Sequence, residues 1–186
     1  MRVTVKPLNE YPLFLRPFFR SQKKKYGEVL LPGLLWGRVP KLFATVAMLY
    51  GALDRKSSPL SPELRSLVTV RVSQINWCLF CVDINSATLA ERSGSMDKVQ
   101  DLEKWKESDL YDKKERVVLE YTEAVTFSDQ QVSDGLIDRL KEFFDEDGLV
   151  ELTGLIAFQN LSSKFNAALD VAPQGFCKLP DDFSES

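Results

Sequence analysis

The sequence predicts an all-α protein with one compact helical bundle. Apolar residues recur at helical spacing along most of the chain, and no stretch alternates apolar and polar residues for long enough to suggest a sheet. The chain has 186 residues, of which 44% are hydrophobic, and this is enough for one sizeable core. We expect an N-terminal arm over residues 1–35, a helical domain over 36–175 and a C-terminal tail over 176–186.

Residues 1–35 depart from the helical pattern. Pro7, Pro12, Pro17 and Pro32 interrupt their short apolar pieces, and proline lacks the N–H group that regular structure requires. We therefore predict an extended arm with at most short turns. Such an arm packs either on its own domain or on a neighbouring subunit.

Two helices are predicted before the cysteines. The stretch 40–54 has apolar residues at helical spacing, and its proline is acceptable in a first turn. In the stretch 61–75, Ser61 is the N-cap, Pro62 takes the first helical position and Glu63 is an early acid. The second helix leads directly to the cysteines.

Cys78 and Cys81 form a CxxC pair in the next helix. Asn76 is its predicted N-cap, and Gly94 ends it in the left-handed conformation. The pair then lies in a first turn, where unpaired N–H groups and the positive end of the helix dipole favour a thiolate. The spacing also permits a disulfide. Because that disulfide closes a very small loop and adds little stability, reversible redox use is favoured over a structural role.

Four more helices are predicted, over residues 96–105, 112–126, 134–144 and 148–169. Polar joints that carry glycine, serine or aspartate separate them, and Pro173 closes the last one. Together with the earlier helices they complete the all-α bundle.

Composition excludes several kinds of chemistry. The chain has no histidine, so it cannot form a Ser/His/Asp triad, a Cys/His dyad or a histidine-ligated metal site. The net charge of −3 gives no long-range attraction for nucleic acid. The basic run Lys23 to Lys25 is interpreted as part of a solvated connecting loop. Without a long apolar run or a signal-peptide core, we expect a cytoplasmic protein with neither nucleic acid nor membrane as partner.

Two other interpretations of the cysteine pair stay open from the residues alone. Cys78 and Cys81 are potentially inert core residues, since buried cysteine behaves as a small hydrophobe. A zinc site would need two more ligands, and Cys177 is the only other thiol. We therefore expect no metal, and Cys177 is expected to remain a free thiol.

The stretch Leu64 to Ala87, LRSLVTVRVSQINWCLFCVDINSA, resembles the carboxymuconolactone decarboxylase and alkyl hydroperoxidase D superfamily. Glu120 to Ala124 and Leu149 to Leu169 fit its C-terminal helices, so the resemblance covers about residues 40–172. It implies an all-helical, AhpD-like fold and homo-oligomers. For members with a CxxC pair, it implies hydroperoxide reduction or thiol-disulfide exchange without a bound cofactor. The cysteines indicate the peroxidase-like branch over the decarboxylase branch.

The chain departs from the motif of this superfamily. The motif places a glutamate twelve residues before the first cysteine and a histidine four residues after the second, and here these positions are Ser66 and Asn85. Asn85 can form hydrogen bonds but cannot shuttle a proton at neutral pH. Glu63 and Asp83 are candidate replacements for the base, although a nearby carboxylate would also raise the thiol pKa by charge repulsion.

Other polar residues have competing interpretations. Glu120 and Glu123 are a candidate acid pair, and a salt-bridged helix face is the competing explanation. Arg71 is expected to pair in the core with a carboxylate such as Glu120. Trp77 is expected to be plain core, with a wall of a substrate cavity as the alternative.

Two asparagines lie in the long, otherwise apolar last helix. Asn160 and Asn166 are expected to make structural hydrogen bonds if they are buried, with a role in a pocket as the alternative.

The main functional hypothesis is an alkylhydroperoxidase-like thiol oxidoreductase. One thiolate attacks the hydroperoxide, the other cysteine resolves the sulfenic acid, and an external thiol reductant completes the cycle. The helix dipole favours Cys78 as the attacking residue, whereas the relay position of the family lies nearer Cys81. The alternatives are an oligomeric helical scaffold that binds a small ligand or partner without peroxidase turnover, and a lactone decarboxylase-type enzyme.

Overall fold

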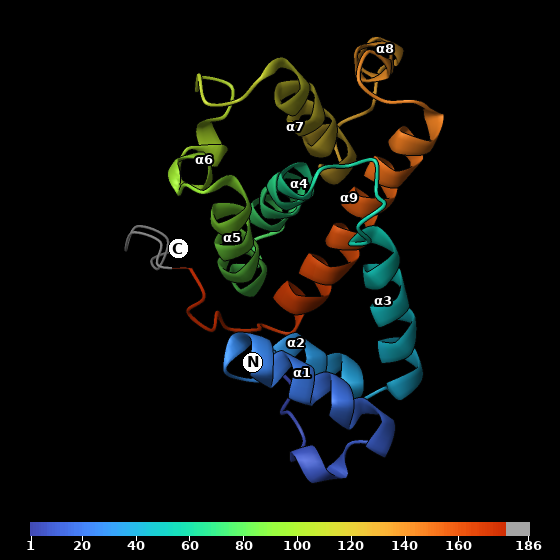
Figure 1. Ribbon diagram of the computed structural model, residues 1–186, viewed down its shortest axis with the longest axis vertical. Coiled ribbons are helices and arrows are strands. Elements are labelled where there is room, and N and C mark those ends of the chain that lie inside the picture. Colours follow the sequence, from blue (N-terminus) through green and yellow to red (C-terminus); the bar gives the residue numbers. More distant parts are fainter. Residues whose placement is uncertain (178–186) are drawn as a thin grey trace.

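The all-α prediction is confirmed in a computed structural model, which describes residues 1–177 (Figure 1). No strand is present in that part of the chain. The helices are α1 (Arg16–Tyr26), α2 (Leu31–Gly37), α3 (Pro40–Leu53), α4 (Pro62–Ile75), α5 (Leu79–Ser93), α6 (Asp97–Gln100), α7 (Lys113–Thr126), α8 (Asp134–Lys141) and α9 (Glu146–Ala168), with 3-10 turns at Leu8–Glu10, Leu13–Leu15 and Leu102–Lys104.

Helix α4 is the central element of the bundle. It packs against α5, α7 and α9, and Figure 1 shows it between these helices. Its side chains Leu67, Val68 and Val72 are fully buried. The predicted N-cap is confirmed, because the Ser61 hydroxyl accepts a hydrogen bond from the Leu64 N–H at 3.2 Å. A helix buried on this many sides fixes the direction of the turn that follows it.

The N-terminal segment corrects the prediction of an extended arm. It forms the helices α1 and α2 and two 3-10 turns, and α2 crosses the expected boundary at residue 35. Pro17 and Pro32 lie in the first turns of α1 and α2, where a missing N–H group costs nothing, so these prolines begin helices instead of preventing them. The run Lys23 to Lys25 lies in the last turn of α1 and is not part of a loop.

This N-terminal layer covers one end of the bundle (Figure 1). Tyr11, Phe19, Trp36 and Phe43 share one apolar cluster. Trp36 stacks on Phe165 of α9, with ring centroids 3.4 Å apart. The segment therefore packs on its own domain, which was one of the two possibilities that the sequence left open.

The helix predicted over 96–105 is divided into α6 and a 3-10 turn. Val99, Leu102 and Trp105 are all buried. Their spacing of three residues suits the three-residue period of a 3-10 turn better than a continuous α-helix. Of the expected tail 176–186, the structure describes only the first two residues. No helix within residues 1–177 has both the length and the apolar content to cross a membrane.

Candidate active site

The turn between α4 and α5 places the cysteines. Asn76 is the C-cap of α4 and does not cap α5 as predicted. Trp77 follows in the left-handed region with a φ of 52°, and Cys78 is the N-cap of α5. The Cys78 Sγ accepts a hydrogen bond from the Cys81 N–H at 3.3 Å. The expected first-turn position of the CxxC pair is therefore correct, with the sulfur itself acting as the capping group.

The two thiols are reduced and buried, and they differ in acidity. Cys78 is 1% exposed and Cys81 is 3% exposed. The pKa of Cys78 is lowered, first because the Cys81 thiol donates to its sulfur and then because the Cys81 N–H does. The pKa of Cys81 is raised well above its ordinary value by the same thiol hydrogen bond, by burial and by the adjacent charge. Cys78 is therefore the first of the pair to lose its proton, and Cys81 is the second.

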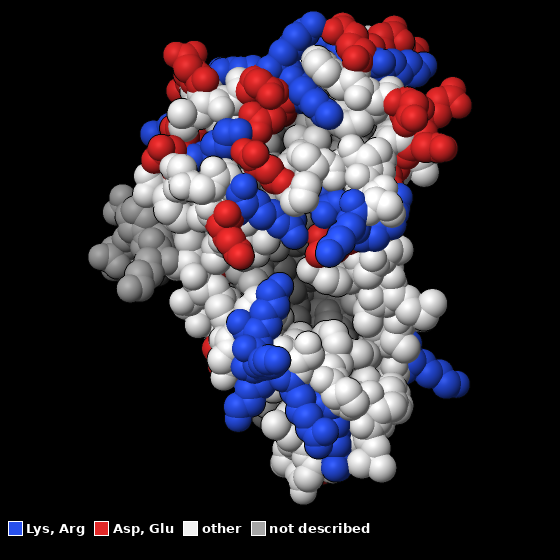
Figure 2. Space-filling model, viewed as in Figure 1, with Lys and Arg blue, Asp and Glu red and all other residues white. Residues whose placement is uncertain are grey.

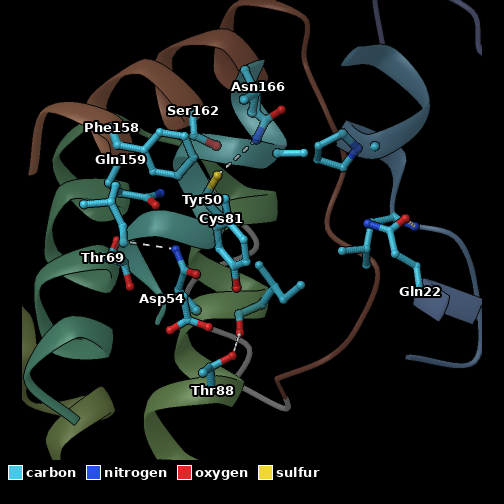
Figure 3. A pocket seen from close by; sticks show the side chains of 18 of the residues that line it. Gln22, Tyr50, Asp54, Thr69, Cys81, Thr88, Phe158, Gln159, Ser162 and Asn166 are labelled. Carbon is cyan, nitrogen blue, oxygen red and sulfur yellow. Dashed lines mark hydrogen bonds between the residues drawn. The ribbon is translucent and has the colours of Figure 1, made fainter. Parts of the chain in front are cut away.

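The side-chain amide of Asn166 contacts the same sulfurs from α9. Its Nδ2 donates to the Cys81 Sγ at 3.2 Å (Figure 3). This donor opposes the rise in the pKa of Cys81, and a hydrogen bond from Gln159 does the same. The Asn166 Oδ1 is buried and has no hydrogen-bond partner within the described part of the chain. Asn166 thus has the pocket role that was the alternative at the sequence level, whereas Asn160 makes the expected structural bonds, to Thr126 and to the Ile156 carbonyl.

Cys81 lines a cavity of about 460 Å³, and Cys78 does not. Helices α1, α2, α3, α4, α5 and α9 all contribute to its walls. The N-terminal layer is therefore part of the site in the same chain. Figure 2 shows the hollow between the bundle and this layer, with Lys and Arg side chains on both sides of it. The apolar part of the wall comes mainly from Trp36, Phe43, Val46, Ile84, Leu155 and Phe158.

Cys78 does not line this cavity. Like Cys81, it belongs to an apolar cluster with Leu35, Phe80 and Val171. Val3, Val5 and Phe176 lie against the same cluster, so both ends of the described chain contribute to it. A molecule in the cavity therefore meets Cys81, with Cys78 behind it.

Uncharged side chains occupy the two relay positions of the superfamily. Ser66 and Asn85 both line the cavity, so the sequence places them correctly near the pair. The Ser66 hydroxyl accepts a hydrogen bond from Arg92 at 3.0 Å, and the Asn85 Nδ2 donates to the Ser73 hydroxyl at 3.2 Å. Neither can take a proton at neutral pH.

Glu63, Asp83 and Glu120 do not line the cavity. Glu63 accepts a hydrogen bond from the Lys98 Nζ at 2.9 Å. Glu120 forms a bidentate pair with Arg139 at 2.6 and 2.8 Å, so the salt-bridged helix face is the correct interpretation. None of the three carboxylates replaces the missing base at the cavity.

Asp83 has a different role. Its Oδ2 accepts hydrogen bonds from the Gln174 and Gly175 N–H groups at 2.8 Å each, and its Oδ1 accepts one from the Cys177 N–H at 2.7 Å. The carboxylate is 5% exposed. Asp83 therefore holds the C-terminal segment against helix α5.

Arg71 and Trp77 differ in outcome. Arg71 makes the expected pair with a largely buried carboxylate, but the partner is Glu123, whose Oε1 lies 2.6 Å from the Arg71 Nη2, and not Glu120. The partners of Glu123, which also include Trp105 and Lys106, lower its pKa against the opposing effect of burial. Trp77 is 78% exposed and is neither core nor cavity wall, because its left-handed backbone turns the side chain outward.

Sequence reasoning missed the charged part of the cavity. Lys25, Asp54, Arg65 and Arg92 line it, at some distance from the cysteines in the sequence. Arg65 carried a signal, because it lies inside an apolar stretch where a charged residue requires buried partners. Lys25 carried none, since its placement depends on the unexpected helix α1.

A helical bundle with a buried, reduced dithiol, one sulfur of which lines a cavity, defines a class of dithiol-bearing helical proteins. Residues 40–124 match the carboxymuconolactone decarboxylase family. Over 175 residues the chain is 47% identical to the uncharacterized protein YnjA of Escherichia coli (strain K12), which covers 94% of this chain and 96% of YnjA. The chain belongs to the carboxymuconolactone decarboxylase family.

Two solved structures share the fold. One is an alkylhydroperoxidase AhpD core, a peroxidase-related protein from Ralstonia eutropha JMP134, with a TM-score of 0.83 and 22% identity, covering 98% of this chain and 93% of that one. The other is a cysteine-to-alanine variant of the debrominase Bmp8 in complex with 2,3,4-tribromopyrrole, with a TM-score of 0.82 and 22% identity, covering 95% of this chain and 93% of that one. These similarities confirm the AhpD-like fold.

Proposed function

We propose that this protein is a thiol oxidoreductase that reduces an organic hydroperoxide bound in the cavity, with Cys81 as the attacking residue and Cys78 as the resolving residue. One observation carries the proposal: Cys81 lines the cavity, and its thiol donates a hydrogen bond to the Cys78 sulfur. The pair has both a substrate-facing sulfur and a resolving sulfur in hydrogen-bonding contact. This arrangement favours the dithiol interpretation over two inert core cysteines.

The shared proton compensates for the absent histidine. Cys78 is the stronger acid of the pair and is ionised first, so it is the base that faces the Cys81 thiol. When Cys81 attacks, its proton passes to Cys78, and the negative charge moves to the sulfur that faces the substrate. Asn166 already donates to that sulfur and stabilises the charge as it forms. The general base is thus inside the CxxC pair.

The chemical steps balance as follows. The Cys81 sulfur attacks the terminal oxygen of the hydroperoxide, the O–O bond breaks, and the products are the Cys81 sulfenic acid and an alkoxide, which takes the proton that Cys78 received and becomes an alcohol. The Cys78 thiolate that this leaves then attacks the Cys81 sulfur, the S–O bond breaks, and the departing hydroxide takes a proton from solvent to form water. The two cysteines are oxidised to a disulfide while the peroxide is reduced. An external dithiol reduces that disulfide and restores the starting state.

Stopped-flow mixing of the reduced protein with cumene hydroperoxide tests this function. We expect consumption of one peroxide and two thiols per chain, at a rate far above that of a free thiol. A Cys177→Ser variant is the matched control, because this third cysteine lies outside the cavity and its loss should change neither number. Unreacted thiols in the wild-type protein would overturn the proposal and favour the non-peroxidase scaffold.

We also propose that the protein forms homo-oligomers through an apolar face of α3 and α9. Leu42 and Leu49 of α3 and Val150 and Leu161 of α9 are large exposed apolar residues, and the two helices contact each other. Exposed apolar residues on two neighbouring helices are typical of a subunit interface. Light scattering of a Leu49→Glu variant tests it: we expect a smaller particle, and an unchanged mass would exclude this face as an interface.

A further inference from the structure

The charged part of the cavity is positive although the protein is acidic. Three basic side chains, Lys25, Arg65 and Arg92, and one acidic side chain, Asp54, line the cavity, whereas the whole chain has a net charge of −3. Figure 2 shows Lys and Arg side chains gathered around the hollow. Low-dielectric walls concentrate the field of such a set and raise the local concentration of anions.

Arg65 and Arg92 lie together at the Asp54 end of the cavity, where hydrogen bonds hold both guanidinium groups in place. The Asp54 carboxylate lies 3.4 Å from Arg65 and 3.2 Å from Arg92. Arg65 also donates to the Leu60 carbonyl, and Arg92 donates to Ser66 and to the Pro62 carbonyl. The Arg65 Nε is buried and has no hydrogen-bond partner among the described residues, although Arg65 is only 6% exposed. One carboxylate is thus shared by two guanidinium groups, and part of their positive charge is not compensated.

Lys25 adds a third cation from the opposite wall. It comes from α1, whereas Arg65 and Arg92 come from α4 and α5. Its Nζ lies 4.8 Å from the centroid of the Tyr26 ring, and no carboxylate within residues 1–177 lies within salt-bridge distance of it. Cations from three helices thus line one cavity, where Tyr50 is within electrostatic range of Lys25, Arg92 and Asp54, and Asp54 neutralises only part of their charge.

Helix α5 sets the distance between Arg92, at the positively charged end of the cavity, and the Cys81 sulfur. Cys81, Asn85, Thr88 and Arg92 all line the cavity and follow one face of α5. Figure 3 shows Cys81 and Asn166 at one end and Asp54 and Thr88 at the other. The eleven residues from Cys81 to Arg92 span about 16 Å along the axis, and an acyl chain of about eight to ten carbons fits this span because the arginine side chain leans back toward the cysteines.

We propose that the substrate is an amphipathic organic acid, whose carboxylate binds Lys25, Arg65 and Arg92 and whose apolar chain carries the reactive group to Cys81. A carboxylate supplies negative charge that the single Asp54 does not provide for the three cations, and the aromatic and aliphatic wall between the two ends accommodates the chain. This inference rests on the proposed function only in treating the ligand as a substrate, since binding of an unreactive acid does not require the thiols.

Calorimetric titration with octanoate and with 1-octanol tests the anion site without any thiol chemistry. We expect octanoate to bind about tenfold more tightly than the alcohol at low salt, since two or more charge-assisted contacts replace neutral ones. A Lys25→Met variant should lose about fivefold in octanoate affinity and nothing in octanol affinity. Lys24→Met is the matched control, because this lysine has the same charge and helix but does not line the cavity, and it should leave both affinities unchanged.

Protection of Cys81 from alkylation by iodoacetamide locates the bound acid. Octanoate should slow this alkylation in the wild-type protein, and more octanoate should be needed for the same protection in Lys25→Met. Equal affinity for acid and alcohol, absence of octanoate binding, or binding without protection of Cys81 would each overturn the inference. Cumene hydroperoxide has no carboxylate, so its reaction reports on the proposed function separately, and either proposal can fail alone.

Discussion

The two cysteines at the start of helix α5 share one apolar cluster but differ in their access to the cavity. On one side, Cys81 and Asn85 line a cavity to which six helices contribute. On the other side, Cys78 lies under apolar residues from both ends of the described chain, and Asp83 fastens the C-terminal segment with three backbone hydrogen bonds. One turn of helix thus separates a sulfur placed for substrate from a sulfur protected from it. The difference teaches that spacing alone does not assign roles to a CxxC pair.

Replacement of each cysteine should have the largest effect on the reaction and tests the different roles of Cys78 and Cys81 directly. Cys81→Ser should lower the rate of peroxide consumption at least about a hundredfold, because no sulfur then faces the cavity. Cys78→Ser should react more slowly than wild type, for a single turnover, and should stop at the sulfenic acid. Rapid mixing followed by dimedone trapping and mass spectrometry distinguishes the two variants. If dimedone labels Cys78 in the Cys81→Ser protein at the wild-type rate, the assigned roles are reversed.

The C-terminal segment should detach more easily when its three hydrogen bonds to Asp83 are weakened. Asp83→Asn keeps the shape of the side chain but removes the charge from three hydrogen bonds, and we expect a loss of about 2 kcal/mol in the free energy of unfolding. In a Cys81→Ser background, the same change should expose Cys78 to a bulky maleimide. Urea denaturation and maleimide labelling measure the two effects.

Asp170→Asn is the matched control for this variant. Asp170 is an exposed acid that pairs only with the N-terminal amine within the described residues, so its change should alter the free energy of unfolding by little. Equal stability of the two variants would mean that the C-terminal segment is held by its apolar contacts and not by Asp83.

Replacement of Asn166, which lines the cavity, should change the pKa of the cysteine pair. Asn166→Ala removes a donor that lowers the pKa of both cysteines. Since the pKa of Cys78 lies below its ordinary value, alkylation of the wild-type pair should remain fast below the range of a free thiol and fall as the pH falls through that pKa. The variant should move this fall to higher pH and lose about fivefold in rate at pH 7, as expected for one hydrogen bond of about 1 kcal/mol.

The pH profile is the decisive measurement for Asn166. A purely structural role would lower the rate equally at every pH, whereas a role in acidity leaves the rate unchanged once the pH is above the first ionisation of the pair. Asn160→Ala, on the same helix but away from the sulfurs, should leave the profile at its original position.

Local signals in the sequence were sufficient for most of the fold and for one side of the site. Helices α4, α5 and α9 follow from apolar periodicity, and the family motif correctly brings Ser66 and Asn85 to the cavity with the cysteines. The failures concern contacts between distant segments. Prolines in the N-terminal segment look like breakers until the segment packs against α9, and the cavity charges converge only through that packing. The burial of Cys78 likewise depends on residues from both ends of the chain.

A change in the turn before Cys78 should have the smallest effect. It tests whether the conformation of this turn or the bulk of Trp77 determines which cysteine reaches the cavity. Trp77 adopts a left-handed backbone, which costs a non-glycine residue about 1 to 2 kcal/mol, and its side chain is largely exposed. Trp77→Gly removes this strain but adds chain entropy to the unfolded state, so we expect a net gain of about 0.5 kcal/mol in urea denaturation. Because glycine keeps the turn, the order of cysteine reactivity should not change. If instead the reactivities of Cys78 and Cys81 become equal, the bulk of Trp77 and not the turn itself aims the N-cap sulfur away from the cavity.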